Sequence, residues 1–179
     1  MTVASYITIS RILLIIPIIY LTHYQDELLN WISLFLFIAA GMSDYLDGYI
    51  ARKTNTETSL GALLDLLADK LLVCLVLLWL VFLSGSLNLI FPALIIISRE
   101  LAVSSLRQFI VEKEGNNPIE VAYIAKSKTT IQFIAISFLL LVPNYGELFN
   151  QITIMLVWIA ALISIYSLLN YFRAYKNYF

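Results

Sequence analysis

The chain has 179 residues, of which 61% are apolar and only 13% are charged, and its formal net charge at pH 7 is −1. Soluble domains carry about 25% charged residues, and a water-soluble fold of this length could not hide so much apolar surface. The balanced charge leaves no basic surface for nucleic acid. A single cysteine, Cys74, excludes an internal disulfide framework and a cysteine-based zinc site. The composition therefore predicts an integral membrane protein.

Six apolar segments have the length of a membrane-crossing helix, which takes about 20 mostly apolar residues. They cover approximately residues 6–22, 28–50, 60–83, 87–110, 121–142 and 148–172. The breaks between them are short and contain residues typical of turns, such as Ser84-Gly85-Ser86. The sequence therefore predicts an all-α fold of six transmembrane helices, in a single domain over residues 1–179.

The distribution of lysine and arginine indicates the orientation in the membrane. The breaks after the first, third and fifth segments contain neither residue, whereas the other two breaks contain Arg52, Lys53 and Lys113. The cations inside the segments fall in the halves nearest those same breaks or the N-terminus, and Arg173 and Lys176 follow the last segment. Because positive residues accumulate on the cytoplasmic side, we expect both termini to lie in the cytoplasm.

Four aspartates lie inside the second and third segments, where ionisable side chains are costly and mark function. Asp44 and Asp47 are three residues apart, and Asp65 and Asp69 are four apart, so each pair shares one helix face. At about 1.5 Å of rise per residue, Asp47 and Asp65 lie about 9 Å from the connecting loop, and the other two about 14–15 Å from it. If the two helices pack as a hairpin, the carboxylates face one another at two matched depths.

Four carboxylates at such close range cannot all stay ionised without positive charge nearby. Their oxygen atoms suit a hard cation such as Mg²⁺ or Mn²⁺, and two acids from each helix can hold two ions. No histidine or cysteine lies close to them, which argues against zinc. Two alternatives stay open: a cluster that ties the helices together, and a path for ions through a divalent-cation transporter.

The residues around these acids resemble the signature of the CDP-alcohol phosphotransferase family, D-x2-D-G-x2-A-R, eight further residues, then G-x3-D-x3-D. Every fixed position is present: Asp44, Asp47, Gly48, Ala51, Arg52, Gly61, Asp65 and Asp69. The resemblance implies the six-helix membrane fold of that family, a homodimer and two divalent cations, Mg²⁺ or Mn²⁺. It also implies transfer of a phosphate-linked group from a CDP-lipid such as CDP-diacylglycerol to an alcohol.

The same resemblance implies a role for each of these residues. Asp44, Asp47, Asp65 and Asp69 would bind the metal ions. Asp69 would also be the general base, taking the proton from the acceptor hydroxyl. The CDP group would be held by Asp47, Gly48, Ala51, Arg52 and Gly61, together with Thr8. For another glycine in the second segment, Gly41, we expect only a role in helix packing.

A cluster of cations in the fourth and fifth segments indicates an anionic acceptor. It contains Arg99, Arg107, Lys126 and Lys128, on the same side of the membrane as the aspartates. Such groups bind phosphate well, and the surrounding stretches 97–107 and 125–130 resemble bacterial members of the family that use glycerol 3-phosphate. This implies that the cluster binds the phosphate of glycerol 3-phosphate, in a bacterial cytoplasmic membrane with the site facing the cytoplasm. Inositol phosphate, phosphatidylglycerol and serine stay open as acceptors.

Overall fold

The computed structural model describes residues 3–54, 59–114 and 122–174, with side chains for 8–43, 61, 64, 66–106, 108 and 129–173. These ranges form six long α-helices and one short 3-10 helix. In chain order they are α1 (Val3–His23), α2 (Glu27–Thr54), α3 (Ser59–Ser84), α4 (Leu87–Glu114), α5 (Ala122–Leu141), η1 (Val142–Asn144) and α6 (Glu147–Ala174). Each apolar segment of the sequence thus corresponds to one long helix, and the described ranges contain no strand.

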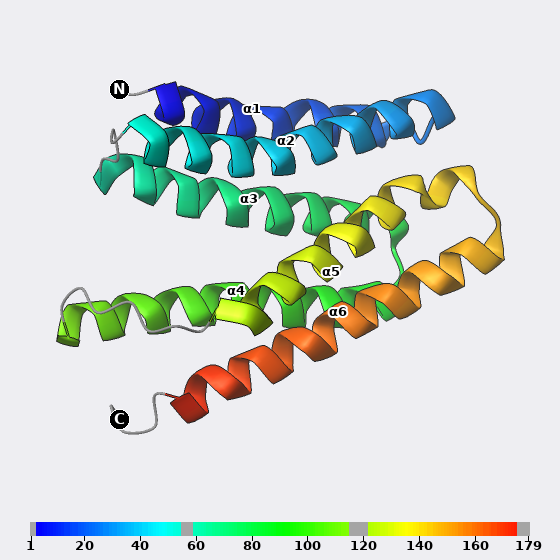
Figure 1. Ribbon diagram of the computed structural model, residues 1–179. Coiled ribbons are helices and arrows are strands. Elements are labelled where there is room, and N and C mark those ends of the chain that lie inside the picture. Colours follow the sequence, from blue (N-terminus) through cyan, green and yellow to red (C-terminus); the bar gives the residue numbers. More distant parts are fainter. Residues whose placement is uncertain (1–2, 55–58, 115–121, 175–179) are drawn as a thin grey trace.

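The long helices form two groups of three, α1 to α3 and α4 to α6 (Figure 1). In the first group α1 packs against α2 and α3, and in the second α6 packs against α4 and α5. Contacts of α5 with α2 and α3, and of α4 with α3, join the groups. The start of α1 and the end of α6 lie at the same end of the molecule as the C-terminal ends of α2 and α4. This is the end expected to face the cytoplasm.

The surface of the helices is that of a membrane protein. Within the described residues, three stretches are long and apolar enough to cross a membrane, Leu66–Ser84, Leu87–Leu106 and Glu147–Arg173, and shorter apolar stretches lie on α1, α2 and α5. Large apolar side chains point outward, and Phe35 and Phe82 are 70% and 73% exposed. Water would not tolerate so much exposed apolar surface, whereas lipid does. The all-α membrane fold expected from the sequence is confirmed.

Short-range signals explain where several helices begin and end. Asp26 Oδ1 accepts a hydrogen bond from the Leu29 N–H at 3.2 Å and so caps the start of α2. Gly85 has a φ of +58°, in the left-handed region that favours glycine, and only two residues connect α3 to α4. At the same end, Asn30 Nδ2 donates to Asn144 Oδ1 at 2.8 Å and ties α2 to η1. These contacts fix the end of the bundle opposite the aspartates.

The core between the helices is apolar and takes side chains from all six. Representative buried residues, one from each long helix, are Ile18, Phe37, Leu72, Ile96, Ile136 and Val157. The two aspartate-bearing helices, α2 and α3, make far less contact with each other than each makes with α1, and α5 also touches both. The arms of the expected hairpin are therefore held mainly by their neighbours, and this leaves room between them for a site.

Candidate active site

A cavity of about 420 Å³ lies where α2, α3 and α5 meet. Its lining residues are Ile38, Gly41, Met42, Asp69, Thr129, Thr130 and Phe133. The partly buried Asp69 of α3 is its acidic group, and the threonines of α5 add hydroxyl groups. Ile38 and Met42 are 40% and 64% exposed, so one edge of the cavity is apolar and lies at the surface of the bundle. A molecule with a polar head and an apolar tail matches this distribution.

The other three aspartates lie on α2 and α3, which are two of the three helices that line the cavity. Asp44 and Asp47 belong to α2, starting two residues after Met42, and Asp65 lies one turn before Asp69 on α3. Their side chains lie outside the described part of the structure. Carboxylate oxygens offered by two neighbouring helices are a donor set that suits a hard divalent cation. The assignment of the four acids as metal ligands stays a prediction.

Phe133 of α5 closes one side of the cavity by packing on Gly41 of α2. A Cβ atom added at Gly41 would lie 2.1 Å from Cζ of Phe133, a distance that no side chain tolerates. The same ring stacks on Phe37, with 4.3 Å between ring centroids and 20° between the planes. This contact supports the expected role of Gly41 in helix packing, and Gly41 also lines the cavity. The contact also determines how far the ring extends into the cavity near Asp69.

A buried guanidinium from α1 lies next to the aspartate segment of α2. Arg11 is 1% exposed and Thr8, one turn earlier, is 2% exposed. Arg11 Nε donates to Ser43 Oγ at 3.3 Å, and Ser43 immediately precedes Asp44. The sequence predicted a nucleotide contact for Thr8 but no site role for Arg11. An arginine inside an apolar segment was the available signal.

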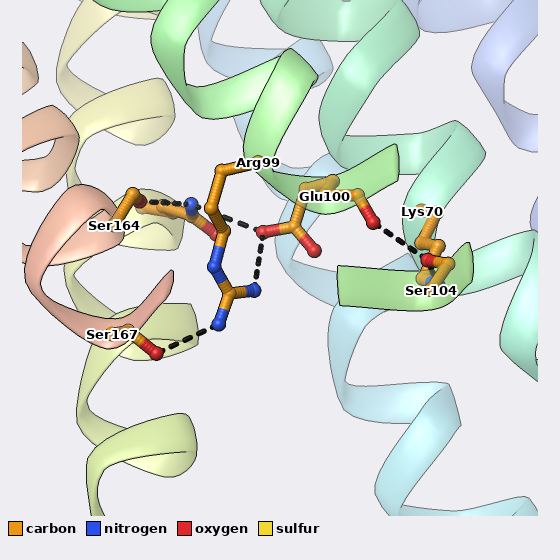
Figure 2. A network of polar contacts seen from close by, with 7 residues as sticks. Lys70, Arg99, Glu100, Ser104, Ser164 and Ser167 are labelled. Atoms are coloured by element: carbon orange, nitrogen blue, oxygen red, sulfur yellow. Dashed lines mark hydrogen bonds and ion pairs between the residues drawn. The ribbon is translucent and has the colours of Figure 1, made fainter. Parts of the chain in front are cut away.

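A buried polar network joins α4, α5 and α6 (Figure 2). Arg99 Nη2 donates to Ser167 Oγ at 2.7 Å, and Nη1 lies 3.5 Å from Glu100 Oε1. Gln132 Nε2 donates to the same Glu100 oxygen at 3.3 Å and to Ser164 Oγ at 3.0 Å. All five residues are at most 9% exposed. Most of their polar groups therefore pair with one another inside the bundle instead of contacting water, but Arg99 Nε and Gln132 Oε1 have no hydrogen-bond partner among the described residues.

Ser104 extends this network toward the aspartate helix. Its hydroxyl donates to the Glu100 carbonyl oxygen at 2.6 Å and accepts a hydrogen bond from the Lys70 ammonium group. Lys70 directly follows Asp69 on α3. Polar contacts thus run from α6 through α5 and α4 to the helix that carries the predicted base (Figure 2).

The structure describes only some of the predicted binding residues. Among the four cations predicted to bind the acceptor phosphate, Arg99 is 4% exposed and lies in the network. The other three lie on α4 and α5 with side chains outside the described residues: Arg107, Lys126 and Lys128. The same holds on α2 for Gly48, Ala51 and Arg52, while Gly61 has a described position on α3. Sequence reasoning did not find Gln132, Ser164 and Ser167, although polar residues inside apolar segments pointed to interhelical contacts.

The fold and the site together define an integral membrane protein with an acidic cavity, open along an apolar edge, between three of its helices. Comparison with protein families matches residues 1–166 to CDP-alcohol phosphatidyltransferase. The chain belongs to this family.

Individual relatives resemble the chain over nearly its whole length. A protein of Rickettsia bellii named CDP-diacylglycerol–glycerol-3-phosphate 3-phosphatidyltransferase is 40% identical, with 98% of this chain and 96% of that protein aligned. Proteins of the same name from Haemophilus influenzae and Salmonella choleraesuis are 35% and 31% identical. Those alignments cover 96% and 98% of this chain, and 92% and 95% of the relatives. The similarity therefore includes all six helices.

Proposed function

We propose that this protein transfers the phosphatidyl group of CDP-diacylglycerol to glycerol 3-phosphate, giving phosphatidylglycerophosphate and CMP. The observation that carries the proposal is the full-length similarity, at 31–40% identity, to proteins named for this reaction. Two features of the chain agree with it. The cavity combines an apolar edge at the surface of the bundle with the carboxylate of Asp69, and the complete aspartate signature lies on the two helices beside it.

The chemistry follows from the position of one carboxylate. A hydroxyl oxygen of glycerol 3-phosphate attacks the lipid-side phosphorus of CDP-diacylglycerol, a new O–P bond forms, and the bond from that phosphorus to the bridging oxygen breaks. CMP leaves with the bridging oxygen. An alcohol proton is too weakly acidic to be lost at neutral pH, so a nearby carboxylate must accept it as the bond forms. We assign this role to Asp69.

Two divalent cations, Mg²⁺ or Mn²⁺, are the proposed cofactors, with Asp44, Asp47, Asp65 and Asp69 as their ligands. Such ions neutralise the charge of the diphosphate and of the leaving CMP. Thr8, Asp47, Gly48, Ala51, Arg52 and Gly61 are the proposed contacts of the CDP group. Arg99, Arg107, Lys126 and Lys128 are proposed to bind the acceptor phosphate, since guanidinium and ammonium groups are the natural partners of a phosphate monoester.

The test is CMP release by purified protein supplied with CDP-diacylglycerol and Mg²⁺. We expect release with glycerol 3-phosphate to exceed that with inositol phosphate, serine or phosphatidylglycerol. Asp69→Asn should abolish it, while the matched variant Asp26→Asn should not, because Asp26 caps α2 at the opposite end and asparagine caps equally well. A preference for another acceptor would overturn the assigned substrate, and undiminished release by Asp69→Asn would overturn the assigned base.

The remaining parts of the proposal are orientation and assembly. We place both termini and the site on the cytoplasmic face of a bacterial membrane, and we propose a homodimer. In a Cys74→Ser background, cysteine at Ser86 should react with a membrane-impermeant thiol reagent applied to intact cells, and cysteine at Lys53 should not. The opposite labelling pattern would reverse the orientation, and a monomeric mass in detergent and in nanodiscs would exclude the dimer.

A further inference from the structure

We propose that Ser167 on α6, assisted by Gln132 on α5, is a positioning residue for the acceptor. Ser167 would hold the Arg99 guanidinium in the one orientation that receives an anionic oxygen of the substrate. The inference rests on the proposed function, because it gives Arg99 a substrate with a phosphate group. It assigns a task in the reaction to α6, which carries none of the predicted site residues.

The hydrogen bonds of Arg99 are the first argument. A buried charge is stable when its donors have partners, yet among the described residues this side chain, at 4% exposure, has one short bond, from Nη2 to Ser167 Oγ at 2.7 Å. Its contact with Glu100 is 3.5 Å long, at the limit of a hydrogen bond. Its Nε–H has no hydrogen-bond partner among the described residues. An anionic oxygen is a strong partner for such a donor.

The bond to Ser167 also determines where the unused donor points. A guanidinium group is planar, and its N–H groups have fixed relative directions. Fixing Nη2 from α6, with Nη1 directed toward Glu100 on α4, therefore fixes the direction of Nε. Without Ser167 the flexible side chain would rotate among several orientations, and binding an anion would then carry an additional entropic cost.

Gln132 binds the same Glu100 oxygen as Arg99, and this accounts for the long 3.5 Å contact between Arg99 and Glu100. Gln132 Nε2 donates to the Glu100 oxygen that faces Arg99, at 3.3 Å, and also to Ser164 on α6 at 3.0 Å. The carboxylate oxygen is thus shared between two donors. Gln132 Oε1 has no partner among the described residues. One donor and one acceptor of the network therefore remain unused, which matches a ligand that carries an anionic oxygen and hydroxyl groups.

The alternative is a network that only ties α4, α5 and α6 together. The two roles differ in what a conservative change does. Loss of a contact that only stabilises the fold lowers stability and weakens the binding of both substrates. Loss of a positioning contact weakens the binding of one substrate. The experiment compares Ser167→Ala, Ser167→Thr and Arg99→Lys with the full-length wild-type protein. Ser33→Ala is the matched control, because the Ser33 hydroxyl is also buried but, among the described residues, bonds to the Leu29 carbonyl oxygen of its own helix.

We expect Ser167→Ala to raise the KM for glycerol 3-phosphate about tenfold, as for loss of a hydrogen bond to a charged group. The kcat and the KM for CDP-diacylglycerol should stay within about twofold of wild type. Arg99→Lys should raise the same KM, because lysine lacks the fork-shaped donor. Ser167→Thr keeps the hydroxyl group, so its KM for glycerol 3-phosphate should stay close to that of the wild type. Ser33→Ala should change neither KM. Glycerol 3-phosphate should raise the Tm of the wild-type protein, and Ser167→Ala should need about tenfold more of it for the same rise.

Three results would overturn the inference. A wild-type KM for glycerol 3-phosphate in Ser167→Ala would do so while leaving the proposed function intact. An equal rise in both KM values together with a lower Tm would show a structural tie only. Absence of glycerol 3-phosphate-dependent CMP release by the wild-type protein would refute the proposed function, and this inference with it.

Discussion

Alanine at residue 41 is expected to dislodge the ring that closes one side of the cavity. The added Cβ would lie 2.1 Å from Cζ and 2.6 Å from Cε1 of Phe133, whereas non-bonded carbons prefer about 3.5–4.0 Å. The ring must therefore move by more than about 1 Å. Phe37, stacked on it with 4.3 Å between centroids, blocks one direction. The cavity beside Asp69 is open, so we expect the ring to move into it and reduce turnover.

The size of the effect follows from two opposing contributions. Overpacking of a buried contact costs about 1–3 kcal/mol, and alanine in place of glycine inside a helix contributes about 1 kcal/mol of stability. In a Phe133→Ala background the clash is absent and only the second contribution remains. The effect of Gly41→Ala on the free energy of unfolding should therefore differ between the two backgrounds by about 1–3 kcal/mol. This corresponds to about 2–4 °C in Tm for each kcal/mol.

The assay is thermal unfolding of the four proteins of this double-mutant cycle in one detergent, combined with CMP release. Gly146→Ala is the matched control, because a Cβ there would meet no atom within 4 Å. An equal change in Tm for Gly41→Ala in both backgrounds would refute the reasoning on packing. Full turnover in Gly41→Ala would refute the claim that the displaced ring enters the cavity.

Three further predictions concern other parts of the molecule. Arg11→Lys keeps the charge but loses the Nε–H that donates to Ser43, so CMP release should fall about tenfold; an unchanged rate would exclude a role for that bond. Asn30→Ala removes the 2.8 Å bond to Asn144 at the opposite end and should lower the free energy of unfolding by about 1 kcal/mol with both KM values unchanged, as checked by Tm and initial rates. Chelation of divalent cations should abolish CMP release, with recovery on adding Mg²⁺ or Mn²⁺, and persistent release would exclude the metals.

The helices could be predicted from the sequence because each apolar segment is long and ends at turn residues. Their packing could not, because hydropathy does not separate a helix face that meets lipid from one that meets protein. Phe35 and Phe37 show this: both lie in α2, yet one is 70% exposed and the other 0%. The packing of α1 against both aspartate-bearing helices, which is closer than the packing of these two helices on each other, depends on such faces.

The candidate site was predictable to the extent that charge in an apolar segment is rare. Asp69 and Arg99 stood out for this reason, and Thr8 through the wider family resemblance. Gln132 and Ser167 did not, since neutral polar side chains occur throughout membrane helices and acquire a meaning only from the partner they face. That partner lies on another helix, 32 to 68 residues away along the chain. Residue spacing within one segment carries no information about such a pair.

The two groups of helices carry different residues of the proposed active site. The first group, α1 to α3, carries every aspartate of the signature, and the second, α4 to α6, carries the cations proposed for the acceptor. Attack requires the acceptor hydroxyl to reach the lipid-side phosphorus within about 3–3.5 Å, so the relative position of the groups controls the reaction. Two described contacts between the groups lie near Asp69: Lys70 with Ser104, and Gly41 with Phe133. Variants of these contacts should therefore impair turnover even when both substrates still bind, which distinguishes them from variants of the Arg99 network, where acceptor binding is the first property lost.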